Sequence, residues 1–276
     1  MHIDIGVGAT DEFNLRVSVA TLAKVIFDHP NHGRRMLVLE RTATLADTGN
    51  TRKVVVRAKP FGGGVRINDP LALQKVVGVY HFDSQRSRAE LDFRVFIRPE
   101  IWLTLVEFCV QHLKLGDDVL DSSPKRELEE EFVDTMDFKV TPEQYSMKPV
   151  GIVIEDIPDR TESVRAAGSP TVRIYRVFEI RIADRLLVDA ILGNNKKYLD
   201  EDLRKLAWQD LNSGGAGRAN AVLAVPLDQL TTAYTAISPE ERIKPIRYKG
   251  HLLDGNVPAI LEGIEVSKYQ RFKVMR

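Results

Sequence analysis

The sequence is poor in cysteine, in long apolar runs and in net charge. Its only cysteine, Cys109, excludes an intramolecular disulfide and a cysteine-based zinc site, and its apolar surroundings predict a buried structural thiol. No stretch reaches the roughly 18 apolar residues of a membrane span, and no basic start with an apolar block indicates a signal peptide. Because 39 basic residues balance 39 acidic ones, no overall field attracts nucleic acid or a membrane surface. We therefore predict a cytoplasmic protein that binds neither, and whose charged groups act locally.

Strand and helix patterns alternate along the chain. Hydrophobic residues make up 43% and charged residues 28% of the 276 residues, which is ordinary for a globular protein. Periodicity predicts strands at residues 15–27, 34–42, 53–58, 91–97, 148–157, 171–182 and 221–227. It predicts helices at residues 99–115, 123–132 and 200–211, and one that begins at residue 227. No low-complexity linker divides these elements, so we predict a single α+β domain over residues 1–276.

Residues 126–131 place four glutamates in one short helical segment. Glu127, Glu130 and Glu131 stand at positions i, i+3 and i+4 and share a face, whereas Leu128 and Phe132 form an apolar stripe toward the core. Like charges at this spacing destabilise a helix by roughly 0.2–0.5 kcal/mol per pair. A divalent cation would reverse that effect, because magnesium binds a few carboxylates together with water and substrate phosphates. The alternative is a solvated acidic face, which is common near a helix N-terminus.

The start of this helix carries further signals. Ser123 suits the N-cap, and Pro124 suits the first helical position. Arg126 places a positive charge in the first turn, where it opposes the helix dipole. We therefore expect Arg126 to have a specific partner, such as a structural ion pair.

Residues 126–131, RELEEE, resemble the R-E-apolar-x-E-E core of the box that defines the Nudix hydrolases. This resemblance implies that Glu127, Glu130 and Glu131 bind Mg²⁺ or Mn²⁺ as the metal cofactor. It implies a structural role for Arg126, which completes the catalytic set. It also implies a Nudix-like α/β/α sandwich with a mixed central sheet and helical insertions.

Flanking segments are similar to other parts of that fold. Residues 17–20 and 34–41 resemble its first strands, and residues 61–65, FGGGV, resemble the glycine-containing segment before the box. Residues 225–230 resemble its late passage from strand to helix. The likeness implies a core at about residues 15–240, an insertion at about residues 70–115 and a C-terminal extension.

The chain also departs from the pattern of the box. His112 stands where the box has a glycine, Asp118 where it has a glutamate, and Val133 where a further glycine follows. About sixty residues separate the glycine triplet from the glutamate helix, so the box is split. These departures keep a second interpretation open, in which the same fold binds a nucleotide-like ligand or a partner protein without turnover.

Three short segments are candidates for binding phosphate. Gly63 and Gly64 allow close backbone approach to an anion. Arg86 and Arg88 lie just before a predicted strand, and paired arginines suit phosphate oxygens. Arg218 ends the glycine-rich residues 213–218, whose N–H groups are a candidate anion cradle. The alternatives are a solvated loop for the arginine pair and a flexible turn for residues 213–218.

The leading hypothesis is a magnesium-dependent hydrolase. It cleaves a phosphoanhydride in a nucleoside diphosphate linked to another group, so its partner is a small nucleotide-type substrate. The first alternative is the non-catalytic nucleotide-binding or regulatory module, and the second is an unrelated α+β protein with a solvated acidic helix. A homodimer is compatible with the sequence, which does not define the oligomeric state.

Overall fold

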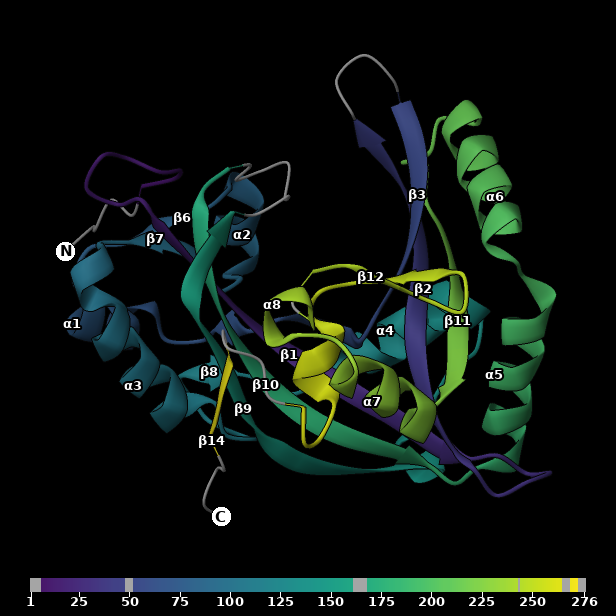
Figure 1. Cartoon of the computed structure of the whole chain (residues 1–276). Helices are drawn as coiled ribbons and strands as arrows, with labels where there is room; N and C mark the ends of the chain where they lie inside the picture. The colour runs from purple at the N-terminus through teal and green to yellow at the C-terminus, as the bar shows by residue number, and fades with distance from the viewer. Residues whose placement is uncertain (1–5, 48–51, 161–167, 243, 265–268, 273–276) are drawn as a thin grey trace.

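The fold combines one large mixed sheet with helices around it (Figure 1). The computed structural model describes residues 6–47, 52–160, 168–242, 244–264 and 269–272. The strands are β1 Leu15–Asp28, β2 Arg35–Asp47, β3 Arg52–Lys59, β4 Phe61–Gly64, β5 Arg66–Ile67, β6 His81–Phe82, β7 Arg94–Ile97, β8 Leu120–Asp121, β9 Tyr145–Arg160, β10 Pro170–Ile182, β11 Ala219–Pro226, β12 Ile246–Tyr248, β13 His251–Leu253 and β14 Tyr269–Phe272. The α-helices are α1 Pro70–Val77, α2 Gln85–Glu90, α3 Trp102–His112, α4 Lys125–Met136, α5 Arg185–Lys197, α6 Asp200–Asn212, α7 Leu227–Thr235 and α8 Pro239–Arg242. The predicted α+β class is confirmed.

Strand β1 organises the sheet. The main strand order is β12-β13-β3-β2-β1-β10-β9-β14, and β11 pairs with β2. Along one edge β1 runs parallel to β10, and along its other edge it pairs successively with β7, β4 and β2, all antiparallel. The three partners therefore diverge from one strand. This divergence separates the part that carries β6, β7 and α2 from the part that carries β2 and β3 (Figure 1).

The two faces of β1 bury different partners. Val17 and Val19 pack in a cluster with α1 and α3, and Ala23 and Val25 pack in a cluster with α4 and α5. Leu22 faces the opposite side, because side chains alternate along a strand, and it packs with the C-terminal residues 253–264. The chain around β1 is thus covered on both faces, which accounts for its long apolar run.

Several elements differ from the sequence-based prediction. The segment with Arg86 and Arg88, for which a solvated loop was the alternative to a phosphate site, forms β6 and α2. The Ser84 side chain caps α2 by accepting a hydrogen bond from the Ser87 N–H. The strand predicted at 91–97 begins only at Arg94, because Leu91 adopts a left-handed conformation with φ of 54°. Helix α4 begins at Lys125, so Pro124 and not Ser123 occupies its N-cap. Helices α1 and α5 were not predicted.

The C-terminal segment completes the core on the face opposite α4. Val257, Ile260 and Leu261 are buried against the cluster that contains Leu22. Buried Lys24 of β1 reaches the same segment, with its Nζ 3.2 Å from a carboxylate oxygen of Glu262. In the part of the chain that the structure describes, no helix is long and apolar enough to cross a membrane.

Candidate functional site

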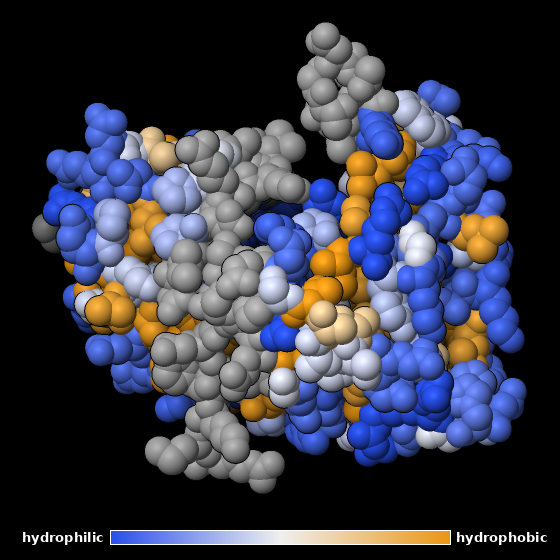
Figure 2. Space-filling model, viewed as in Figure 1, coloured by the Kyte–Doolittle hydropathy of each residue, from blue (hydrophilic) through white to orange (hydrophobic). Residues whose placement is uncertain are grey.

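A cleft of about 920 Å³ opens where the partners of β1 diverge. Its lining includes three glycines, six basic side chains and six acidic side chains. Hydrophilic side chains lie in a hollow between the part with β6, β7 and α2 and the part with β2 and β3 (Figure 2). The cleft therefore has no excess of either charge but concentrates both, which suits a ligand that carries anionic groups together with a cation.

The glycine strand β4 forms one part of this lining. Gly62 has φ of +149°, and a Cβ at this position would collide with the Thr21 carbonyl oxygen of β1. Only glycine avoids this collision, since β4 lies directly against β1. The Gly62 N–H donates a hydrogen bond of 2.8 Å to Oε2 of Glu131. This bond ties the glycine strand to the glutamate helix, although about sixty residues of chain separate them.

Helix α4 turns an apolar stripe inward and an acidic face toward the cleft. Leu128 and Phe132 are buried, as predicted, and the Phe132 ring stacks on the Phe61 ring with centroids 4.9 Å apart. Three acidic side chains of this helix line the cleft, namely Glu130, Glu131 and Asp134. Packing of the apolar stripe therefore fixes the direction in which these carboxylates point.

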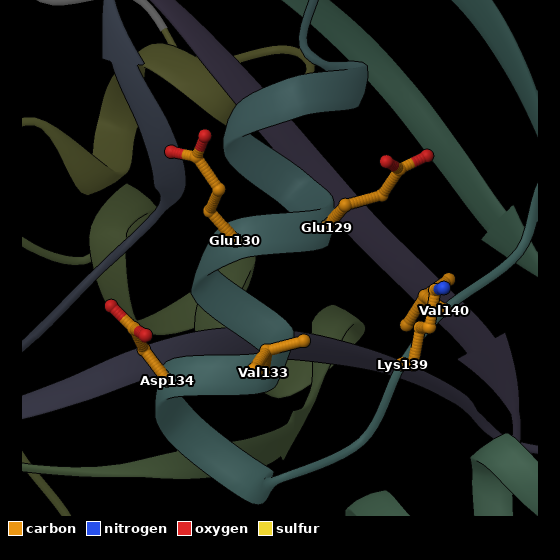
Figure 3. Close-up of a pocket in the computed structure, with 6 residues that line it drawn as sticks. All are labelled: Glu129, Glu130, Val133, Asp134, Lys139 and Val140. Atoms are coloured by element: carbon orange, nitrogen blue, oxygen red, sulfur yellow. The ribbon is translucent and has the colours of Figure 1, made fainter.

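The other side of α4 borders a second, smaller pocket of about 490 Å³. Glu130 and Asp134, which line both pockets, point to one side of the helix, whereas Glu129 and Val133 point to the side on which Lys139 lies (Figure 3). Glu129 does not line the large cleft. It is therefore a natural control for substitutions of the cleft-lining carboxylates.

A buried carboxylate holds two cations beside the acidic face of α4. Glu40 of β2 is 0% exposed. Its Oε1 accepts hydrogen bonds from Thr42 Oγ1 at 2.9 Å and Arg218 Nη2 at 3.3 Å, and its Oε2 lies 2.9 Å from Lys59 Nζ. Lys59 Nζ also lies 3.9 Å from Oε1 of Glu131. We call Lys59, Arg218, Glu130, Glu131 and Asp134 the helix wall of the cleft.

The ion pairs of Glu40 shift the protonation of both partners. Burial alone would raise the pKa of Glu40, but Lys59, Thr42 and Arg218 outweigh that effect and lower it. Burial would lower the pKa of Lys59, but Glu40 and Glu131 raise it. At neutral pH Glu40 is therefore ionised and Lys59 is charged, which keeps a positive charge beside Glu131.

The opposite side of the cleft, which we call the arginine wall, contains Arg16, Arg66, Arg86 and Arg94 with Asp83, Glu90 and Asp92. Its base is a buried ion pair, in which Arg16 Nη2 lies 2.7 Å from Oδ2 of Asp83. Oδ1 of the same carboxylate accepts a hydrogen bond of 2.6 Å from Ser87 of α2. Burial would raise the pKa of Asp83, but Ser87 and Arg16 together lower it, so the pair is charged. This network fixes α2 against β1.

Asp92 connects the arginine wall to the glycine strand. Its Oδ2 lies 3.0 Å from Nη1 of Arg94, whereas its buried Oδ1 has no hydrogen-bond partner among the described residues. A Cβ at Gly64 would collide with this carboxylate, so the absence of a side chain at Gly64 makes room for Asp92. Burial raises the pKa of Asp92.

The structure brings together six of the residues that the sequence singled out. Gly63, Gly64, Arg86, Arg218, Glu130 and Glu131 all line the cleft. Arg88 is exposed on α2 but does not line the cleft, because α2 turns Arg86 and Glu90 toward it instead. The side chains of Arg126 and Glu127 lie outside the described residues, so their predicted roles stay predictions.

The glycine-rich residues 213–218 do not offer a free anion cradle. The backbone N–H groups of Gly217 and Arg218 donate to Oδ2 of Asp210, at 2.9 Å and 3.1 Å. This carboxylate occupies the position that an anionic ligand would take, which favours the alternative of a turn over the candidate cradle. Only the side chain of Arg218 reaches the cleft.

The helix wall suits magnesium that is completed by water and phosphate. Among the described residues, no three His, Cys, Asp or Glu side chains converge closely enough to hold a metal alone. Oε2 of Glu131 accepts the hydrogen bond from the Gly62 N–H, and its Oε1 faces Lys59. The neighbouring Glu130 is exposed. Magnesium commonly binds one or two carboxylates, keeps several waters and adds substrate phosphates. These donors fit such an ion bound together with an anionic ligand.

The sequence did not indicate four charged residues on which this geometry depends, namely Arg16, Glu40, Lys59 and Asp92. Some signal was present, since Glu40 and Arg41 interrupt the apolar run of β2, and a charge in a buried strand requires a partner. Comparison of the chain with protein-family models, curated proteins and solved structures yields no match.

Proposed function

We propose that this chain is a magnesium-dependent hydrolase of the Nudix type, which cleaves a phosphoanhydride in a nucleoside diphosphate linked to another group. The observation that carries the proposal is the bond between Gly62 and Glu131. It joins the two halves of the split motif, so that glycine strand and glutamate helix face the same cleft. The resemblance of residues 126–131 to the Nudix box supports the same conclusion.

The charges of the helix wall support binding of a diphosphate. Lys59 and Arg218 line the cleft, and buried Glu40 holds the charged group of each in place. Cations fixed in this way lose little conformational entropy when they bind phosphate oxygens. The carboxylates of Glu130 and Glu131 lie next to them and would repel a bare diphosphate. A divalent cation between the two groups removes this repulsion, so we expect metal and diphosphate to bind together.

The reaction adds water across the phosphoanhydride. The oxygen of the attacking water forms a new bond to one phosphorus, the bond from that phosphorus to the bridging oxygen breaks, and the protons of the water pass to the products. Magnesium, when bound, would neutralise the phosphate oxygens and lower the pKa of the attacking water. Lys59 and Arg218 would stabilise the negative charge that accumulates on the phosphoryl oxygens. Gly62 holds Glu131 in place through its N–H.

Turnover of a substrate panel tests the proposal. Nucleoside diphosphate sugars, dinucleotides and related compounds are incubated with the full chain and Mg²⁺, and release of the two phosphorylated products is measured. We expect turnover of at least one class, and a reduction of roughly 100-fold or more in the double variant Glu130→Gln/Glu131→Gln. Glu129→Gln, on the other side of the same helix, is the matched control and should retain activity.

A binding module without turnover is the second candidate. It is favoured by two departures from the Nudix box, in which Val133 and His112 stand where the box has glycines. Val133 is exposed, and His112, the last residue of α3, has its Nδ1 3.2 Å from the Asp117 carboxylate. Thermal stabilisation by a diphosphate compound with Mg²⁺, without any product, would favour this candidate over the hydrolase.

A further inference from the structure

Arg66 differs from the other cations of the arginine wall. Arg16, Arg86 and Arg94 each form an ion pair, with Asp83, Glu90 and Asp92 respectively. The side chain of Arg66 lines the cleft and is exposed, and among the described residues it has no ion pair or hydrogen bond. The wall therefore has four arginines and three carboxylates, and the unmatched positive charge belongs to Arg66.

The acidic neighbours of Arg66 already have other partners. Its strand β5 pairs with Asp121 of β8 on one side and forms an isolated bridge with Asp92 on the other. The Asp121 carboxylate accepts a hydrogen bond of 3.0 Å from the Ser123 N–H, and the Asp92 carboxylate pairs with Arg94. Neither carboxylate binds Arg66, so its guanidinium is available to a ligand in the cleft.

The backbone around Arg66 is held in place. Ile67 N–H donates to the Leu91 carbonyl oxygen, and Phe93 N–H donates to the Val65 carbonyl oxygen, both at 2.8 Å. Val65 and Ile67, which flank Arg66, are both fully buried in the core. A cation on such a rigid strand loses little freedom when an anion binds, which favours affinity.

Arg66 lies at a distance from the helix wall. It belongs to β5, four positions along the chain from Gly62 of β4, the residue bonded to Glu131. At about 3.3 Å per extended residue, the chain between the two positions reaches at most about 13 Å. Lys59, Arg218 and Glu131 gather around Glu40, and Arg66 belongs to the other wall of the cleft. A ligand whose diphosphate lies at the helix wall therefore meets Arg66 with a different part.

We propose that Arg66, supported by the Asp92–Arg94 pair, is a binding site for a second phosphate group, a phosphate monoester remote from the diphosphate. This inference rests on the proposed function, because it places the diphosphate at the helix wall. It names the substrate class as nucleoside diphosphate derivatives that carry such a monoester on a sugar. The guanidinium donates two parallel hydrogen bonds to the monoester oxygens, and its charge offsets theirs.

Matched pairs of dinucleotide-type compounds test this inference. NADP⁺ differs from NAD⁺, and coenzyme A from its dephospho form, by one phosphate monoester. Binding of methylene-bridged analogues of these compounds, which cannot be hydrolysed at the bridge, is measured by calorimetry with the wild-type chain and Mg²⁺. We expect at least one pair to show about tenfold tighter binding of the phosphorylated member, as one charge-assisted contact provides. In Arg66→Ala this preference should disappear, while the unphosphorylated member binds as before.

Two further variants sharpen the test. Arg66→Lys keeps the charge and should retain part of the preference, whereas Arg88→Ala, an exposed arginine outside the cleft, should retain all of it. Equal affinity within both pairs, failure of all four compounds to bind, or a preference that survives in Arg66→Ala would overturn the inference. A preference that depends on Arg66, without turnover of any compound, would support the inference and overturn only the hydrolase.

Discussion

The two walls of the cleft use similar charges in different ways. In the arginine wall the basal pair is closed, because Arg16 and Asp83 are each 5% exposed and bind one another. Behind the helix wall only the carboxylate of the ion pair is buried, since Glu40 is 0% exposed while the side chain of its partner Lys59 is 34% exposed. A closed pair fixes structure, whereas a buried anion with exposed cations presents charge to a ligand.

This difference predicts which wall carries stability and which carries binding. Breaking a closed buried pair leaves an uncompensated charge in the interior, which is costly. Loosening cations that already face the cleft costs less, because water can solvate them. Substitutions in the buried Arg16–Asp83 pair should therefore lower the free energy of unfolding most. Substitutions around Glu40 should lower both the free energy of unfolding and the affinity for the ligand.

The largest expected effect on stability is at Asp83. Asp83→Asn leaves buried Arg16 without its counter-charge, so we expect the free energy of unfolding to fall by about 3–5 kcal/mol, measured by urea denaturation at pH 7. The control is Glu90→Gln, which removes the exposed pair with Arg86 and should change stability by less than about 0.5 kcal/mol. Equal effects of the two variants would contradict the contrast between closed and open pairs.

A smaller loss is expected at Glu40. Glu40→Gln removes the charge that holds Lys59 and Arg218, and we expect a loss of about 1–3 kcal/mol together with a higher KM for the diphosphate substrate. Because the folded pKa of Glu40 is lowered below 4.5, its contribution is present above that pH and is lost as the pH falls through the folded value. Unchanged stability and KM would show that Glu40 does not position these cations.

The smallest effect is expected at Asp92. Its folded pKa is raised above 3.8 by burial, so the wild-type chain loses stability as the pH rises from 3.8 through the folded value. Asp92→Asn does not titrate there and keeps an oxygen for Arg94. Relative to the wild type it should gain up to about 1 kcal/mol between pH 3 and pH 7 in urea denaturation. A stability difference that is independent of pH would contradict this assignment.

The sequence predicted those elements whose hydrophobic pattern follows directly from their burial. Strands β1 and β10 have long apolar runs because they pair with each other in the middle of the sheet. Helix α5 was missed because it contains Gly193, Asn194 and Asn195, which do not favour a helix interior. The structure gives their reason, since Asn194 and Asn195 accept hydrogen bonds from N–H groups of β11 at 2.9 Å and 3.0 Å. Such long-range contacts outweigh local propensity and leave no periodic signal.

The sequence indicated site residues only where they belong to a local pattern, and not the long-range pairs that connect them. The glutamates of α4 stand at helical spacing, so their shared face follows from local geometry. Glu40 and Lys59 belong to neighbouring strands and meet through the register of β2 with β3, in which Glu40 pairs with Lys59. The partners Arg16 and Asp83 are 67 residues apart in the chain. Long-range pairing of this kind depends on topology, which the charge pattern of a single sequence does not specify.

Direct measurement of metal binding tests the central claim that the helix wall binds a divalent cation together with a diphosphate. Mn²⁺ is titrated by electron paramagnetic resonance into the full chain in the presence of a methylene-bridged dinucleotide, which cannot be hydrolysed at the bridge. The account predicts stoichiometric Mn²⁺ binding to the wild type and to Glu129→Gln, and a loss of affinity of roughly 100-fold in Glu130→Gln/Glu131→Gln. Equal Mn²⁺ binding by all three proteins would contradict it.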